Sequence, residues 1–239
     1  MDNKKEEIID INEKGRSKDG DPISLDRRLF MQFLAFGDCD NIESIINELK
    51  KVNIDAALYA DINDFQGIGL LVMSEDPELF VGVLRDFLGK SLFSRLTGKP
   101  EYTMLGRTYS LGYEDDLERT LILGPRAKIF NEDLNWVIWY PLQRTKEFEN
   151  LSADKQRAIL GEHGKIGFKF GRAGLATDIR LACHGLDKED NDFVIGILGK
   201  NLHPLSAVVQ NMRKTEQTSK YLDKLGPFFI GKKIWQSHK

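Results

Sequence analysis

The side chain with the clearest capacity for cofactor chemistry is His163, one of four histidines in a chain of 239 residues. It follows a helical pattern at 151–163, and the apolar turn 158–160 brings its imidazole close to an apolar face. Gly164 is a natural helix C-cap, and a neutral imidazole near a helix end is a normal axial ligand for haem iron. The residues leave a plainer alternative open, a histidine that caps the helix or faces solvent.

Two charged residues occur in a stretch, 178–183, that otherwise has the pattern of a buried strand. Asp178 and Arg180 share one face of that strand because successive side chains point to opposite faces. Unpaired charge is costly on a strand covered from both sides, so an ion pair between Asp178 and Arg180 is one explanation for their presence.

A second aromatic strand is predicted at 135–142. Tyr140 shares one face of it with Trp136 and Ile138, whereas Val137 and Trp139 share the other face. The simplest reading of these aromatic side chains is a buried core.

The two halves of the chain show the same order of elements. In the first half, apolar runs predict strands at 29–36, 56–59, 67–73 and 102–109. Apolar residues at helical spacing predict helices at 41–52 and after Asp76-Pro77, because proline is well tolerated in a first helical turn. The second half repeats this order with strands at 135–142, 178–183, 193–198 and 228–230 and helices at 151–163 and from His203-Pro204.

A repeated split β-α-β unit is the ferredoxin-like arrangement. We therefore predict an α+β fold in which two ferredoxin-like β-α-β-β-α-β units form a dimeric α+β barrel. The N-terminal unit covers 25–120, and the C-terminal unit, which carries the candidate site, covers 121–239. The polar segment 1–24 is expected to be a flexible, mostly disordered arm, with packing on a neighbouring subunit as an alternative.

The composition argues against several classes of function. A net charge of −3 gives no general attraction for nucleic acid, and 41% hydrophobic residues is ordinary for a soluble globular protein. Cys39 and Cys183 form no CxxC pair, so neither a zinc site nor a disulfide framework is indicated. No apolar run approaches the ~20 residues of a membrane helix, and the charged first residues are unlike a signal peptide. We expect a cytoplasmic protein without nucleic-acid partners or a membrane span.

Several of these segments resemble the chlorite dismutase superfamily, which includes the coproheme decarboxylases. The resemblance spans residues 25–234 and is strongest from Tyr140 through Ile230. Glu162-His163-Gly164, followed by Gly167, is similar to the family's proximal-histidine segment, which implies that His163 is the metal ligand. Glu216 matches the carboxylate that bonds the other nitrogen of that histidine and raises its basicity.

The resemblance also implies further residues around the cofactor. Tyr140-Pro141 is similar to a Tyr-Pro-x-x-Lys segment whose tyrosine carries a radical to a haem propionate. Arg144 stands at the lysine position, where an arginine can hold a propionate in a bidentate contact. Tyr109 resembles a tyrosine whose hydroxyl bonds a propionate, with a barrel-core tyrosine as the alternative.

The sequence departs from the family pattern on the distal side of the cofactor. Counting back from Gly185-Leu186-Asp187 places Asp178 where true chlorite dismutases have arginine and many decarboxylases have glutamine. A register shift of two residues would place Arg180 there instead. The tryptophan common after the Tyr-Pro segment in decarboxylases is missing, and 147–150 stands in its place.

The resemblance as a whole implies a haem-binding oxidoreductase. Its cofactor would be haem b or coproheme, and its small oxidant would be peroxide or chlorite. The expected activity is the peroxide-dependent oxidative decarboxylation of porphyrin propionates, with Tyr140 as the radical residue. Chlorite dismutation to chloride and dioxygen, or haem binding without catalysis as a carrier or sensor, are the alternatives. A homo-oligomer is also expected, because members of the family commonly form pentamers.

Overall fold

The computed structural model describes residues 9–237, so the first part of the expected arm, 1–8, lies outside the described residues. The N-terminal half contains strands β3 (Phe30–Gly37), β4 (Asp55–Asp61), β5 (Ile68–Ser74), β6 (Thr97–Gly98) and β7 (Met104–Arg107). Its helices are α1 (Ile42–Leu49), α2 (Glu78–Val81) and α3 (Val83–Lys90), with short 3₁₀ turns η1 (Leu92–Arg95) and η2 (Pro100–Tyr102). These elements follow the predicted β-α-β-β-α-β order.

The C-terminal half repeats the order. A π-helical turn, η3 (Arg119–Leu123), and α4 (Gly124–Phe130) connect the halves. The strands are β8 (Trp136–Arg144), β9 (Thr177–Ala182), β10 (Phe193–Gly199), β11 (Leu222–Leu225) and β12 (Phe229–Gln236). The helices are α5 (Lys146–Glu149), α6 (Ala153–Arg172), α7 (Leu202–Met212) and α8 (Glu216–Lys220).

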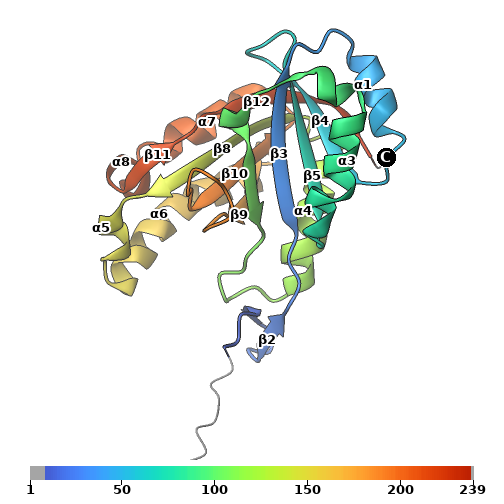
Figure 1. The fold of residues 1–239 in the computed structure, drawn as a ribbon. Coiled ribbons are helices and arrows are strands. Elements are labelled where there is room, and N and C mark those ends of the chain that lie inside the picture. Colours follow the sequence, from blue (N-terminus) through green and yellow to red (C-terminus); the bar gives the residue numbers. More distant parts are fainter. Residues whose placement is uncertain (1–8, 238–239) are drawn as a thin grey trace, which may run out of the picture.

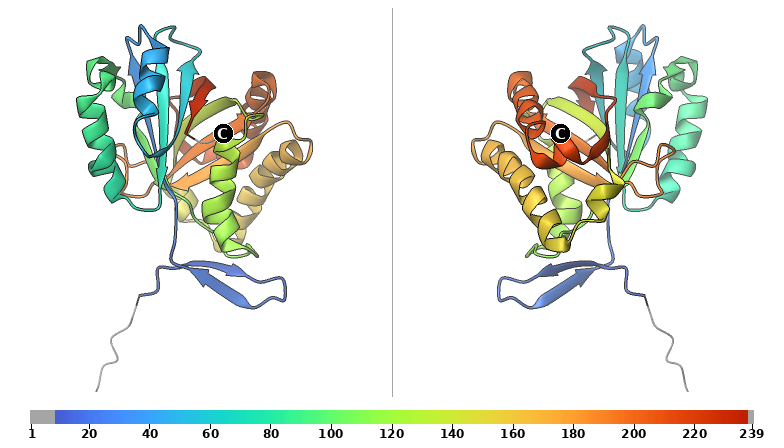
Figure 2. Two further views of the ribbon diagram at one scale, coloured as in Figure 1. Left: turned by 90° about the vertical axis from the view of Figure 1, so that its right-hand side faces the viewer. Right: turned by 90° about the vertical axis from the view of Figure 1, so that its left-hand side faces the viewer.

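The main sheet closes on itself within this one chain. Its strands follow the ring order β8, β12, β4, β5, β3, β7, β9 and β10, and β10 pairs again with β8. All of these pairings are antiparallel, and β7 joins β9 through a single residue pair, Arg107 with Ala182. Helices α1 and α3 cover the outside of one part of the ring, while α6 and α7 cover another part (Figures 1 and 2). The predicted α+β barrel is confirmed.

Strand alternation divides the buried residues between the inside and the outside of the barrel. On β8, Val137 and Trp139 belong to the interior core, together with Phe33 and Phe229. The intervening residues of β8 belong to the cluster beneath α7, namely Ile138, Tyr140 and Leu142. The predicted division of β8 into two faces is therefore confirmed. The outer face of β8 is the one that meets the C-terminal helices.

The long helix α6 extends beyond its predicted end. The sequence pattern placed its end at Gly164, but the helix continues to Arg172 and ends before Gly174, whose φ is +64°. A glycine inside a helix costs only ~1 kcal/mol relative to alanine, and Phe170 packs against the outer cluster in the added turns. Within residues 9–237, no helix combines the length and the apolar character needed to cross a membrane.

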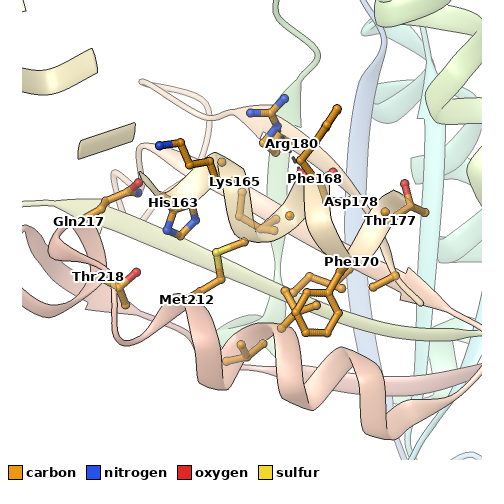
Figure 3. Close-up of a pocket in the computed structure, with 18 of the residues that line it drawn as sticks. His163, Lys165, Phe168, Phe170, Thr177, Asp178, Arg180, Met212, Gln217 and Thr218 are labelled. Atoms are coloured by element: carbon orange, nitrogen blue, oxygen red, sulfur yellow. Dashed lines mark ion pairs between the residues drawn. The ribbon is translucent and has the colours of Figure 1, made fainter. Parts of the chain in front are cut away.

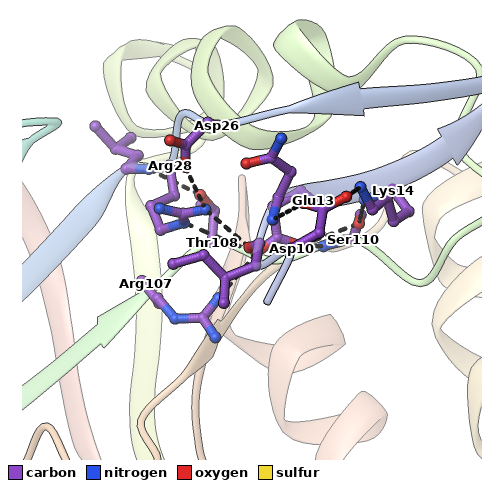
Figure 4. Close-up of polar contacts among 11 residues, drawn as sticks. Asp10, Glu13, Lys14, Asp26, Arg28, Arg107, Thr108 and Ser110 are labelled. Atoms are coloured by element: carbon purple, nitrogen blue, oxygen red, sulfur yellow. Dashed lines mark hydrogen bonds and ion pairs between the residues drawn. The ribbon is translucent and has the colours of Figure 1, made fainter. Parts of the chain in front are cut away.

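The N-terminal arm contains regular structure that its polar sequence did not indicate. Strands β1 (Glu13–Arg16) and β2 (Pro22–Leu25) form an antiparallel hairpin that extends from the barrel (Figure 2). The Glu13 carboxylate accepts hydrogen bonds from Arg107 Nη1 at 2.9 Å and from the Ser110 backbone at 2.8 Å (Figure 4). These contacts join segments more than 90 residues apart, so a local sequence pattern could not predict the hairpin.

The close approach of two barrel residues gives a test of this packing. A Cβ added to Gly196 would lie 2.5 Å from the ring of Trp139, so Gly196→Ala must displace the indole or the strand. Overpacking of this kind costs ~1–3 kcal/mol, and we expect the free energy of unfolding in urea to fall by that amount. Gly161→Ala is the control, because no atom lies within 4 Å of the added Cβ and alanine favours the helix. Equal stability of the two variants would contradict this description of the core.

Candidate functional site

A cavity of about 750 Å³ lies between the outer face of the barrel and the C-terminal helices. Its sheet wall includes Tyr140 of β8 and Ile195 and Ile197 of β10, which point outward by strand alternation. Its helix wall includes Phe170 of α6 and Met212 of α7 (Figure 3). The size and the largely apolar lining are typical of small-molecule and cofactor sites.

Helix α6 brings His163 into this cavity. The residue lines the wall next to Gly164 and Gly167 (Figure 3). Burial, together with the positive charges of Arg144 and Arg180, lowers the pKa of His163 to about 4. The imidazole is therefore neutral at pH 7, which is the form that binds metal ions.

The hydrogen bonds around His163 define its tautomer. Its Nδ1 lies 3.2 Å from Oγ1 of Thr215, and that hydroxyl donates to the backbone oxygen of Met212 at 2.8 Å. A hydroxyl has one hydrogen, so Thr215 accepts at its contact with His163 and Nδ1 carries the ring proton. The lone pair of the neutral ring is then on Nε2, the nitrogen available to a metal.

Thr215 occupies the place at which Glu216 was expected. The Glu216 carboxylate instead forms ion pairs with Lys220 at 3.5 Å and Lys155 at 3.8 Å. The reason is local, because Thr215 is the N-cap of α8 and its side chain turns back toward the helix start. A threonine followed by a short helical pattern is a capping signature, and that signal could have identified Thr215.

Asp178 and Arg180 both line the cavity from β9. Arg180 Nε lies 3.3 Å from Asp178 Oδ2, which confirms the expected ion pair, although both side chains are about half exposed. The two residues also line a second cavity of about 390 Å³ on the side of α4, where Lys128 Nζ donates to the Asp178 backbone oxygen at 2.6 Å. The pair therefore stands between two cavities, and both residues remain candidates for the distal position.

Tyr140 contributes its ring to the cavity wall, as the sequence suggested. The ring stacks on Phe228 with centroids 4.6 Å apart, and only 7% of the residue is exposed. Burial raises the pKa of its phenol, so the hydroxyl keeps its proton across the physiological range.

Arg144 and Tyr109 lie beside the cavity, around Phe193. The Arg144 guanidinium packs over the rings of Phe148 and Phe193, 4.7 and 4.6 Å from their centroids. The Tyr109 ring packs against the same Phe193 ring, with centroids 5.6 Å apart, and Tyr109 lines the smaller cavity. Neither residue lines the cavity that holds His163.

Three cationic residues and one buried amide of the cavity were not expected from the sequence. Lys165, Arg172 and Arg213 line it as cations, and Gln217 is 4% exposed with an Oε1 that has no hydrogen-bond partner among the described residues. Lys165 and Arg172 share one face of α6, but they stand two and nine residues after His163 and therefore on a different face of the helix. The helical period would not have paired them with His163.

The fold and this cavity define a closed α+β barrel with a histidine-bearing pocket under its C-terminal helices. The family model for chlorite dismutase matches residues 40–234, and the chain therefore belongs to the chlorite dismutase family. No curated protein matches the sequence significantly.

Solved structures share the fold at low sequence identity. A heme-binding protein from Thermus thermophilus is 16% identical, with a TM-score of 0.69 over 88% of this chain and 92% of that one. A variant of chlorite dismutase from Candidatus Nitrospira defluvii is 15% identical, with a TM-score of 0.69 over 88% and 93%. Another variant of that enzyme, in complex with cyanide, is 15% identical, with a TM-score of 0.68 over 88% and 92%. At these identities the likeness establishes the fold.

The depressed pKa of His163 predicts a specific pH dependence of stability. The unfolded chain takes up a proton on His163 near pH 6.5, whereas the native protein takes it up only near pH 4. The free energy of unfolding should therefore fall as the pH drops through this window, and His163→Gln should reduce that slope. Urea unfolding at several pH values within the window measures it. Equal slopes in both proteins would contradict a buried neutral imidazole.

Proposed function

We propose that this protein binds an iron porphyrin in the larger cavity, with Nε2 of His163 as the axial ligand, and that it acts as a haem-dependent oxidoreductase. The observation that carries the proposal is a buried imidazole on the wall of an apolar cavity of about 750 Å³, with its Nδ1 3.2 Å from the Thr215 hydroxyl. Membership of the chlorite dismutase family and the similarity to a heme-binding protein support the same reading.

The residues of the cavity fit such a ligand. The apolar side chains of β8, β10 and α7 suit a flat macrocycle, and a single neutral imidazole is a common protein ligand of haem iron. The amide oxygen of Gln217, buried without a partner among residues 9–237, would gain one from a polar ligand group or from water.

The charge of the lining favours a porphyrin with several carboxylates. Among the described residues, the lining of the cavity includes one acidic side chain, Asp178, and four cationic side chains. The cations are Lys165, Arg172, Arg180 and Arg213. Coproheme carries four propionates and haem b carries two, so the positive lining supports coproheme as the natural ligand. A decarboxylase that uses coproheme as its substrate is the specific activity that we infer.

Several groups of the chain have distinct tasks in this reaction. The iron of the bound porphyrin supplies the redox chemistry with peroxide. His163 binds the iron, and Thr215 stabilises the tautomer of His163 that has its proton on Nδ1. The apolar walls exclude water. We assign to the protonated phenol of Tyr140 a hydrogen-atom relay, in which its radical removes a hydrogen atom from a substrate propionate. One further electron passes by way of the porphyrin to peroxide, the two-electron oxidant of the overall reaction, and carbon dioxide leaves to give a vinyl group. The Asp178–Arg180 pair offers polar contacts to the small oxidant.

Chlorite dismutation is the second candidate, and the observation that favours it is the presence of Arg180 in the cavity wall. A cation there could steer an oxyanion, but the contact with Asp178 at 3.3 Å offsets its charge. Oxygen evolution from chlorite that disappears in Arg180→Gln would select this activity over decarboxylation.

Porphyrin titration tests the proposed ligand. Absorption titrations should give a tighter complex with coproheme than with haem b by at least about tenfold, or ~1.4 kcal/mol. Arg213→Gln and Lys165→Gln should reduce this preference, whereas Lys51→Gln, on a distant exposed loop, should retain it. In His163→Ala, the axial imidazole signature of the spectrum should be lost. Equal affinities for both porphyrins would contradict the choice of coproheme, and an unchanged spectrum in His163→Ala would contradict the binding site.

Replacement of Tyr140 tests the decarboxylation step. Tyr140→Phe keeps the ring that stacks on Phe228 but removes the hydroxyl, so coproheme should still bind while vinyl formation stops. Mass spectrometry of the porphyrin after peroxide addition detects each loss of carbon dioxide. Tyr102→Phe, in which a tyrosine packs on Phe229 away from the cavity, is the control and should react as the wild type does. Undiminished product from Tyr140→Phe would rule out this role.

A further inference from the structure

The partner of His163 Nδ1 in this chain is a neutral hydroxyl. Thr215 Oγ1 lies 3.2 Å from Nδ1, and the neighbouring carboxylate of Glu216 is paired with Lys220 and Lys155. We propose that Thr215 is the positioning residue that sets the basicity of His163, and that it holds the reduction potential of a bound iron porphyrin above the value that a carboxylate in its place would give. This inference rests on the proposed binding of an iron porphyrin by His163.

Three contacts fix the Thr215 hydroxyl in its role as acceptor. Its two possible acceptors are the Met212 backbone oxygen at 2.8 Å and the Thr218 hydroxyl at 3.4 Å, and the shorter contact takes its single hydrogen. As the N-cap of α8 it also accepts from the backbone N–H of Thr218 at 3.5 Å. The remaining lone pair accepts from His163. Because Thr215 is only 2% exposed, water cannot easily replace these contacts. Rotation of the side chain about χ1 would move the oxygen away from all three partners.

The backbone around Thr215 is held against α6 at the same point. The Glu162 carboxylate, one residue before His163, accepts a hydrogen bond from the Glu216 N–H at 3.0 Å. Consecutive residues of α6 thus contact consecutive residues at the start of α8. The Ser219 hydroxyl adds a bond to the Thr215 backbone oxygen at 2.8 Å. The spacing between the ring and its acceptor is therefore set by two paired segments rather than by one flexible side chain.

The chemical identity of the acceptor decides how much electron density the ring gives to iron. A carboxylate bonded to Nδ1–H draws the proton toward itself, which makes the imidazole a stronger donor and stabilises ferric iron. A neutral hydroxyl that already donates elsewhere polarises the N–H bond less. Glu216 cannot supply the missing charge in this arrangement, because two lysines neutralise its carboxylate and solvent screens it. Iron bound here is therefore more easily reduced than carboxylate-backed iron.

Substitutions at Thr215 and Glu216 separate the two residues. The reduction potential of the ferric–ferrous couple is measured by dithionite titration of the protein reconstituted with haem b, together with the iron–histidine stretching frequency of the ferrous form. Thr215→Asp keeps a favourable N-cap and adds a carboxylate at Nδ1, so the potential should fall and the frequency should rise. Thr215→Ser keeps the hydroxyl and should give wild-type values. Glu216→Gln should also leave both values unchanged.

The outcomes that overturn the inference are distinct from those that overturn the proposed function. An unchanged potential and frequency in Thr215→Asp, or a shift in Glu216→Gln as large as in Thr215→Asp, would overturn the role of Thr215 alone. If Thr215→Asp does not fold, Thr215→Val removes the acceptor, and a potential equal to that of the wild type would overturn the role equally. Failure of the wild type to bind haem, or an unchanged spectrum in His163→Ala, would overturn the proposed function together with this inference.

Discussion

Closure of the sheet through β8 is the constraint on which the rest of the structure depends. β8 pairs with β12 on one side and with β10 on the other, so the two halves of the chain share one interior core. Trp139 fills that interior over Gly196, and the next residues along both strands must then point outward. The outward residues are apolar and need a cover, which α6 and α7 provide. The cavity is the space that remains between this sheet face and its two helices.

The same geometry determines what the cavity can bind. α6 runs past Gly164, so His163 comes from the middle of a helix whose later turns, with Phe170, complete the wall. α7 ends at Met212, whose backbone oxygen accepts a hydrogen bond from the Thr215 hydroxyl. The hydroxyl oxygen is then the acceptor for the Nδ1–H of His163. The unprotonated Nε2 of His163 therefore faces an apolar space with cations at its margin. These features agree with the chemistry of an iron porphyrin that carries several carboxylates.

The order of the elements could be predicted from the sequence, because in each half the apolar residues recur in the same order of strand-like and helix-like patterns, with periods of 2 and 3.6 residues. The end of α6 could not be predicted, because Gly164 is a plausible C-cap locally, whereas the added turns are stabilised by tertiary contacts such as the packing of Phe170. The hairpin of β1 and β2 depends on Glu13 meeting Arg107, a contact that no local pattern encodes. At the site, His163, Tyr140, Asp178 and Arg180 were expected together, and they line one cavity. A capping signature marks Thr215 as the start of α8, but it does not show that this residue contacts His163, 52 residues away in the sequence.

A crystal structure of the protein with iron coproporphyrin tests the central claim most directly. We expect the porphyrin between β8, β10 and α6, with iron bonded to Nε2 of His163 and with the Nδ1–H of that ring still donating to the Thr215 hydroxyl. The carboxylates of the porphyrin should lie next to Lys165, Arg172 or Arg213. Iron bonded to a different residue, or a porphyrin bound outside this cavity, would contradict the account.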